Sequence, residues 1–242
     1  MRIPTDIRDY LNHALNESRL TEFSIDRKLN KVSVVFETVA LNEDGTIPDD
    51  SRVVFSFINV SRLAGKLKLG EWNDESAKTE TFQPEELTER LLNYKGHSMY
   101  GWEFINVDNS DKEFEKWEND SSFDIKLFDC QNDVNTIDIF SEHFSEKPKT
   151  LDLRVWFEEI EIESLNGIPM TTQEFIDRGV RGWNAIYEGN NGMTKAHGIV
   201  ALSDEKEKNT THNKGYNQAG QSAKSKDNTI NKIWSWLTGK RL

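Results

Sequence analysis

The stretch RVVFSFINVSRLAG at residues 52–65 is followed 102 positions later by RVWFEEIEIESLNG at residues 154–167. Arg, Val, Phe, Ile, Leu and Gly coincide at six of the fourteen aligned positions. In both copies the alternation of apolar residues changes phase, at Ile58 in the first and at Ile160 in the second. Because successive side chains of a strand point to opposite faces, this change predicts a β-bulge or a tight bend at the same place in each copy.

The segments around the two copies follow the same order. Short strand patterns precede each copy, and a predicted helix follows each one, at 84–94 and at 172–187. The second helix opens on TTQE at 171–174, which has the spacing of a capping box. We therefore predict an internal duplication, with repeat one at about 22–94 and repeat two at about 122–187.

The rest of the pattern predicts an α+β fold that is mainly antiparallel sheet. Ile7, Leu11 and Leu15 recur every four residues and predict an N-terminal helix at about 4–19. Segments of alternating apolar residues, separated by turn-forming residues, predict the strands. We expect the helices to cover one side of the sheets and to bury the aromatic residues.

The net charge of −12 over 242 residues is an average of two unlike parts. Residues 203–242 hold eight Lys and Arg against four Asp and Glu, which makes +4, so residues 1–202 carry −16. Between 203 and 228 the chain is mostly Lys, Asn, Ser, Gly and Gln, which bury too little apolar surface to offset their ordering entropy. We predict a folded acidic body at 1–202 and a disordered linker at 203–228.

The last fourteen residues, 229–242, predict a short amphipathic docking peptide. Its apolar residues follow helical spacing and include two tryptophans: Ile230, Ile233, Trp234, Trp236 and Leu237. Because so short a helix is marginal in water, it should form only when docked. Its own body, a groove on a partner protein and a membrane surface all remain open as the docking site.

Two further features of the body are candidate partner-binding surfaces. In the acidic segment 158–163, strand alternation places Glu159, Glu161 and Glu163 on one face. This face is either the solvated side of a half-buried strand or an anionic surface for a basic protein partner. Tyr100 and Trp102 also alternate along a predicted strand, where they serve either core packing or a binding rim.

Motifs that carry chemistry are absent from the sequence. It contains neither a phosphate-binding glycine loop nor a nucleophile elbow, so we predict no catalytic residue and no cofactor. Asp138, Glu142 and His143 have the nearest spacing to a metal site, but a solvated loop explains them and we predict no metal. Because affinity for phosphates depends on Lys and Arg, the acidic charge argues against nucleic-acid binding.

The strand pair followed by R-V-x-F-x-x-I-x-V-x-x-L at 52–63 and a small helix resembles β-rich domains of uncharacterised bacterial proteins. Some of these domains are grouped with the immunity proteins of polymorphic toxin systems. The resemblance covers most of residues 20–190 and depends on strand patterns. It implies binding to a protein partner and brings no active-site residues.

These observations together predict a bacterial, non-catalytic interaction protein. Its acidic body would bind a basic protein, and its C-terminal peptide would make a second contact. Two alternatives are an enzyme whose carboxylates meet His97, His143 or His197 only in the fold, and a membrane-surface adaptor that uses residues 229–242. A single cysteine and the lack of a long apolar run predict a cytoplasmic location.

Overall fold

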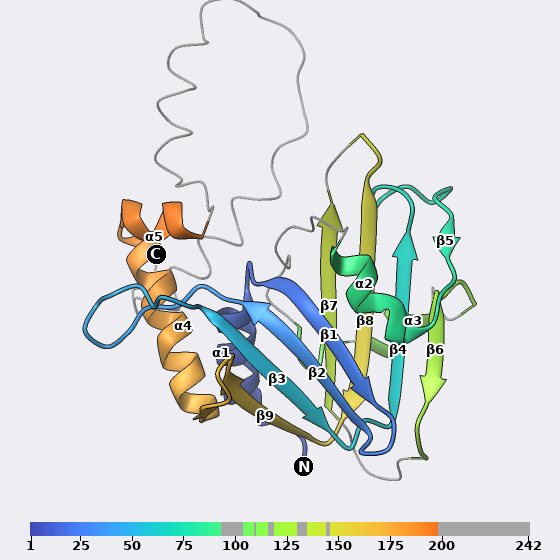
Figure 1. The fold of residues 1–242 in the computed structure, drawn as a ribbon, viewed down its shortest axis with the longest axis horizontal. Helices are drawn as coiled ribbons and strands as arrows, with labels where there is room; N and C mark the ends of the chain where they lie inside the picture. The colour runs from blue at the N-terminus through green and yellow to red at the C-terminus, as the bar shows by residue number, and fades with distance from the viewer. Residues whose placement is uncertain (93–103, 109, 116–118, 130–134, 144–145, 198–242) are drawn as a thin grey trace, which may run out of the picture. The chain divides into compact units, whose positions relative to one another are not determined.

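The computed structural model describes residues 1–92, 104–108, 110–115, 119–129, 135–143 and 146–197 (Figure 1). Its helices are α1 (Thr5–Leu15), the 3₁₀ turn η1 (Pro84–Glu86), α2 (Leu87–Leu92), α3 (Ser110–Glu115), α4 (Thr172–Tyr187) and α5 (Asn191–Ala196). Its strands are β1 (Arg19–Asp26), β2 (Lys31–Glu37), β3 (Arg52–Ile58), β4 (Arg62–Lys68), β5 (Thr79–Glu80), β6 (Phe123–Lys126), β7 (Asn135–His143), β8 (Lys149–Phe157), β9 (Glu159–Ser164) and β10 (Pro169–Met170). The predicted α+β class with an N-terminal helix is confirmed.

The strands form two antiparallel sheets. Sheet A has the order β1-β2-β3-β9-β10, and sheet B has the order β5-β4-β8-β7, with β6 also paired to β4. α1 and α4 lie together against sheet A, whereas α2 lies along β1, where the Thr88 hydroxyl bonds to the Phe23 backbone (Figure 1). The helix α2 thus protects an edge strand that would otherwise present unpaired backbone groups.

The repeated stretch carries the chain from one sheet to the other. After β3 in sheet A, Asn59 has a left-handed backbone with φ of 53°, and the chain then enters β4 of sheet B. After β8 in sheet B, a single residue, Glu158, separates that strand from β9 of sheet A. The phase change seen in the sequence therefore marks a tight bend between two sheets.

Each sheet contains strands from both predicted repeats. The elements β1 to β5 and α2 of repeat one occur in the same order as β6 to β10 and α4 of repeat two. If β1 to β5 are matched in order with β6 to β10, the run β2-β3-β9-β10 of sheet A matches the run β7-β8-β4-β5 of sheet B. The first strand of each repeat differs, because β1 pairs with β2, whereas its counterpart β6 pairs with β4. Because the strands are interleaved, neither repeat could keep its sheet partners alone. The duplication itself stays a prediction.

The core lies between the inner faces of the two sheets and under the helices. The rings of Phe57 in sheet A and Phe157 in sheet B are 4.8 Å apart, and Phe175 of α4 meets Phe55 edge-on at 5.0 Å. A Cβ built on Gly179 of α4 would lie 2.5 Å from the Cβ of Ala14, so α1 and α4 pack this closely only because residue 179 is glycine. Helices and sheets are thus locked into one core.

Local chemistry explains where α4 begins, and the predicted start at 172 is confirmed. The Thr171 side chain accepts a hydrogen bond from the Glu174 amide at 3.1 Å, which satisfies a backbone donor that the helix cannot.

The N-terminal helix is shorter than predicted, because Glu17 has φ of 57° and β1 begins at Arg19. The strand β4, whose sequence RLAGKLK hides its alternation, was missing from the prediction.

Several predicted features lie outside the described residues: Tyr100, Trp102, the linker at 203–228 and the peptide at 229–242. In the predicted strand that contained the two aromatic residues, the described part makes an isolated bridge between Ile105 and Ile137. Within the described ranges, none of the helices has the length and apolar content needed to cross a membrane.

Candidate functional site

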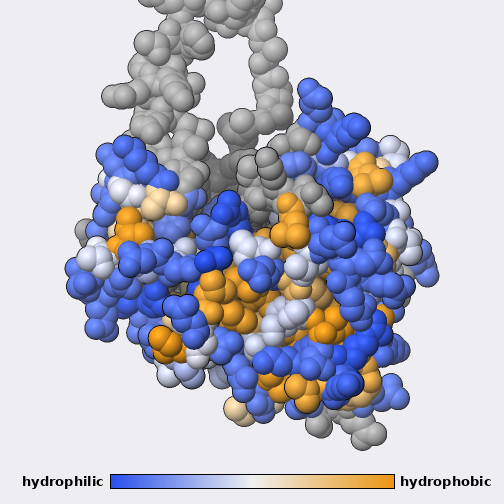
Figure 2. Space-filling model, in the orientation of Figure 1, coloured by the Kyte–Doolittle hydropathy of each residue, from blue (hydrophilic) through white to orange (hydrophobic). Residues whose placement is uncertain are grey.

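The described helices that contact sheet A lie on its inner face or at its edge, which leaves its outer face without a covering helix among the described residues, although Val35 and Ser56 at its centre are buried (Figure 1). We call this surface the acidic face, and define it by Glu22, Ser24, Ser33, Val35, Val54, Ser56, Ile58, Glu159, Glu161 and Glu163. Strand alternation places these side chains together and sends Phe23, Phe55 and Ile162 into the core. Figure 2 shows an apolar and weakly polar centre bordered by hydrophilic side chains.

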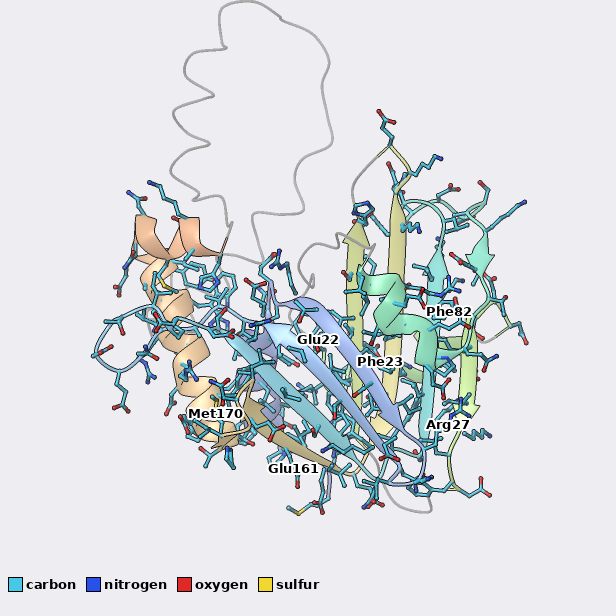
Figure 3. All side chains as sticks on the ribbon, viewed as in Figure 1. Glu22, Phe23, Arg27, Phe82, Glu161 and Met170 are labelled. Carbon is cyan, nitrogen blue, oxygen red and sulfur yellow. The ribbon has the colours of Figure 1, made fainter. Side chains whose placement is uncertain are left out.

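The pairing register places carboxylates at both sides of this centre. One row across the sheet runs Glu22, Val35, Val54 and Glu163. The next row runs Ser24, Ser33, Ser56 and Glu161. In Figure 3, the labelled Glu22 on β1 and Glu161 on β9 lie on opposite sides of β2 and β3. The centre between them is lined by small side chains.

Within the described part of the chain, the carboxylates of Glu22, Glu159, Glu161 and Glu163 have no hydrogen-bond or ion-pair partner. The two arginines at one end of the sheet are engaged by other acids: Arg19 pairs with Glu37, and Arg52 pairs with Asp50 at 2.8 Å. The acidic face therefore carries more carboxylates than cations, with Arg52 near Glu22 and Lys31 of β2 as the cations closest to it.

The three predicted glutamates of β9 lie together as the alternation required. Glu159 and Glu161 are exposed and Glu163 is half-buried, whereas Ile162 on the other side of the strand is buried. Their role in partner binding stays a prediction. Sequence reasoning missed Glu22, because it reaches this face only through the pairing of β1 with β2 and an irregularity between Leu20 and Glu22.

The outer face of sheet B has a different character, because its charges are paired. Its guanidinium groups are held by carboxylates, with Arg62 Nη2 2.5 Å from Asp124 Oδ2 and Arg154 Nε 2.5 Å from Asp138 Oδ1. Phe114 of α3 packs edge-on against Trp156 at 5.0 Å, beside both arginines. We call this surface the paired face and define it by Arg62, Lys66, Lys68, Phe114, Asp120, Asp124, Asp138, Phe140, Asp152, Arg154 and Trp156.

A hollow of about 610 Å³ opens on the paired face, and Asp152 of β8 lies in it. Burial and, to a smaller extent, the nearby charge of Asp138 raise the pKa of the Asp152 carboxyl to about 6, against the opposing effect of Lys66 and Lys68. Asp152 was not singled out by the sequence. Its only signal is an acidic residue within the apolar strand LDLRVWF at 151–157.

A second hollow, of about 560 Å³, brings a histidine and carboxylates together. His197 lines it with Glu37 and Asp50. Burial lowers the pKa of His197, and the charge of Glu37 raises it in part. Of the other two histidines considered for an enzyme site, His97 lies outside the described residues, and His143 ends β7 on the face opposite Asp138.

The weak metal candidate from the sequence does not assemble. Asp138 is committed to Arg154, Glu142 is 3% exposed, and His143 points to the other face of the strand. Among the described residues, no three His, Cys, Asp or Glu side chains are placed so that they could hold a metal ion.

No family model, no curated protein and no solved structure matches this chain. Its function must therefore be argued from its own surfaces. Two of them stand out: a face on sheet A whose glutamates have no ion-pair partner among the described residues, and a hollow on sheet B in which the same holds for Asp152.

Proposed function

We propose that this protein is a non-catalytic binding protein whose acidic face docks a basic protein partner, as expected of an immunity or assembly protein. One observation carries the proposal. Four glutamates without partners among the described residues surround a small-residue centre on a sheet face that the described helices leave open. The two arginines at one end of this face are held by Glu37 and Asp50, so neither forms an ion pair with the four glutamates.

Electrostatics supports a cationic partner. Glu159, Glu161 and Glu163 are alternate residues of one strand, so neighbours are separated by about 7 Å along the chain. At that distance two like charges repel by about 0.6 kcal/mol in bulk water and by about 2.4 kcal/mol at an effective dielectric constant of 20. A partner that presents Lys or Arg relieves this repulsion, and the field of the face accelerates the encounter.

The centre of the face supports direct protein contact. The Ser33 and Ser56 hydroxyls form a hydrogen bond with each other at 3.1 Å. The centre between the glutamates of β1 and those of β9 therefore consists of small side chains whose polar groups are paired. Val54 adds partly exposed apolar surface beside it, whereas Val35 and Ser56 are buried at 7% and 2% exposed. An apolar and neutral centre within a charged rim is the usual composition of a transient interface.

In this proposal the C-terminal peptide at 229–242 makes a second contact with the partner, through the apolar residues Ile230, Ile233, Trp234, Trp236 and Leu237. Two weak contacts joined by one chain gain affinity, because the second binding step becomes intramolecular. The membrane surface remains the alternative site for this peptide.

Affinity capture from cells of the source organism, followed by mass spectrometry, tests the proposal. The test variant is Glu159→Gln/Glu161→Gln/Glu163→Gln, and the matched control is Glu43→Gln/Glu89→Gln/Glu188→Gln, at exposed glutamates elsewhere. Both triples change the net charge from −12 to −9. We expect the wild type and the control to capture the same basic protein, and the test triple to lose it. Equal capture by all three would contradict the proposal.

The second hollow supports an alternative function, an enzyme that uses His197 for proton transfer. Because burial lowers the pKa of His197, its imidazole is neutral near pH 7 and can accept a proton, and Glu37 would stabilise the cation formed. Screening hydrolysis of chromogenic esters and phosphate esters tests this alternative. Turnover by the wild type that His197→Gln abolishes would favour the enzyme.

A further inference from the structure

The hollow on the paired face has a floor that crosses three strands. Lys66 on β4 is paired in register with Asp152 on β8, and Asp152 is paired with Phe140 on β7. The indole of Trp72 stands at the rim and is 63% exposed, a large fraction for the largest apolar side chain. The hollow therefore combines a carboxylate floor with aromatic walls.

Each cation that faces Asp152 from the described strands has another partner. Lys66 Nζ lies 2.7 Å from Asp120 Oδ2, and Lys68 Nζ donates to the Trp72 carbonyl at 3.2 Å. Arg154 forms a two-pronged pair with Asp138. These cations therefore make the surroundings of the hollow less negative, but none of them forms an ion pair with Asp152.

Asp152 itself has no hydrogen-bond or ion-pair partner in the part of the chain that the structure describes. A half-buried carboxylate without a partner is costly, because burial removes water that protein groups do not replace. A ligand that supplied hydrogen-bond donors and a positive charge would remove that cost.

The chemistry of the lining decides the class of ligand. A carboxylate beside Trp and Phe rings is suited to an organic cation, which gains both an ion pair and contact with aromatic faces. An anion would find Lys66 and Arg154 already bound to Asp120 and Asp138. A divalent metal ion needs several oxygen ligands, and among the described carboxylates on the floor strands of the hollow only Asp152 has no hydrogen-bond or ion-pair partner.

We propose that the hollow between Asp152, Phe140 and Trp72 binds an organic cation that carries an ammonium or guanidinium group. The cation sits over the floor and donates to the Asp152 carboxylate, while Trp72 covers its apolar part. Because this site lies on sheet B, it is independent of the acidic face and of the partner proposed for it. The cation is either a free amine or a Lys or Arg side chain of another protein.

Proton competition provides a sharp readout. The charged groups facing Asp152 are Lys66 and Lys68 on β4, Asp138 on β7, Arg154 on β8, and Glu75 and Asp120 from the flanking loops. Since the pKa of Asp152 is raised to about 6, a proton competes with the cation just below neutral pH. Affinity should be constant above pH 7 and fall by about tenfold for each unit below pH 5.5.

Titration of the full chain with agmatine, monitored by tryptophan fluorescence and by calorimetry, tests the site. We expect binding by the wild type, at least a tenfold loss in Asp152→Asn, and a smaller loss in Trp72→Ala. Asp177→Asn, an exposed carboxylate on α4, is the matched control and should bind as the wild type does. A peptide that contains a single arginine and has blocked termini is titrated in parallel. It distinguishes a protein side chain as the ligand from a free amine.

Folding does not obscure the result, because Asp152→Asn removes a costly charge and should not lower the melting temperature. Inorganic phosphate is the opposing probe, and saturable phosphate binding that Asp152→Asn leaves intact would overturn the proposal. Absence of binding by both agmatine and the arginine peptide at millimolar concentration would overturn it as well. So would binding that is equal in the wild type and in Asp152→Asn.

Discussion

The two sheets share one architecture but treat their charges in opposite ways. On the acidic face of sheet A, the β9 glutamates have no partners among the described residues, and Ser33 and Ser56 form a neutral centre. On the paired face of sheet B, Arg62, Lys66 and Arg154 are each paired with an aspartate, whereas Asp152 has no such partner among the described residues. Net charge alone therefore does not locate a binding surface. The informative quantity is which charges the fold leaves without a partner.

Removing the central base of the paired face should have the largest effect. Arg154 is 2% exposed and pairs with Asp138, so Arg154→Met keeps much of the volume but leaves the Asp138 carboxylate without its partner. We expect the free energy of unfolding to fall by about 3–5 kcal/mol, as for other broken buried pairs. Urea unfolding followed by circular dichroism measures this. A loss below about 1 kcal/mol would mean that the pairing is not structural.

Replacing Asp152, the carboxylate without a partner among the described residues, should change the free energy of unfolding in the opposite direction. Because the pKa of Asp152 is raised in the folded state, its ionised form destabilises the fold, and stability is lost as pH rises from about 4 through about 6. Asp152→Asn should therefore raise the free energy of unfolding by about 2 kcal/mol at pH 7.5, with partial exposure taken into account. The gain should disappear near pH 4. Unfolding curves at both pH values check this, and a gain that is equal at both would contradict it.

Neutralising the acidic face should stabilise the protein modestly. In Glu159→Gln/Glu161→Gln/Glu163→Gln, the repulsion between neighbouring carboxylates is lost, so we expect about 1 kcal/mol of added stability at low ionic strength. Because these groups lie near solvent, 1 M salt should remove most of the difference. The Glu43, Glu89 and Glu188 control triple should change stability less. A gain that salt does not alter would argue against electrostatics as its cause.

The smallest effect should come from the exposed ion pair at the end of sheet A. Arg52 and Asp50 are both about 40% exposed, so their pair is screened by water. We expect Arg52→Met to leave the free energy of unfolding unchanged within the precision of the measurement, in contrast with Arg154→Met. The same urea experiment provides the comparison. A large loss at Arg52 would erase the distinction between the two faces.

Much of the fold was predictable from local patterns. The start of α4 at Thr172 followed from the Thr171 and Glu174 spacing, because a cap is a contact between near neighbours in the sequence. The alternation of Glu159, Ile160 and Glu161 likewise defined one exposed face of β9, since strand geometry has a period of two. The strand β4 was missed because Ala64, Gly65 and Lys66 carry little of that period.

The candidate sites were predictable only in part. Three of the four partnerless glutamates on the acidic face lie on one strand, and the fourth, Glu22, joins them through pairing across β2 and β3. The hollow at Asp152 was not predictable at all. Its properties depend on Asp120 and Asp138 holding the cations that would otherwise pair with Asp152, and these residues are distant in sequence.

The sequence by itself determined the class of fold, the faces of the individual strands and the bend that the repeated RVxF stretch encodes. These follow from periodicity and capping, which act over a few neighbouring residues. Only the tertiary structure decided that the bend moves the chain between two sheets, and that within the described residues Asp138 has an ion-pair partner while Asp152 has none. The reason is physical: the partner of a charge is set by pairing across strands, and that pairing joins residues far apart along the chain.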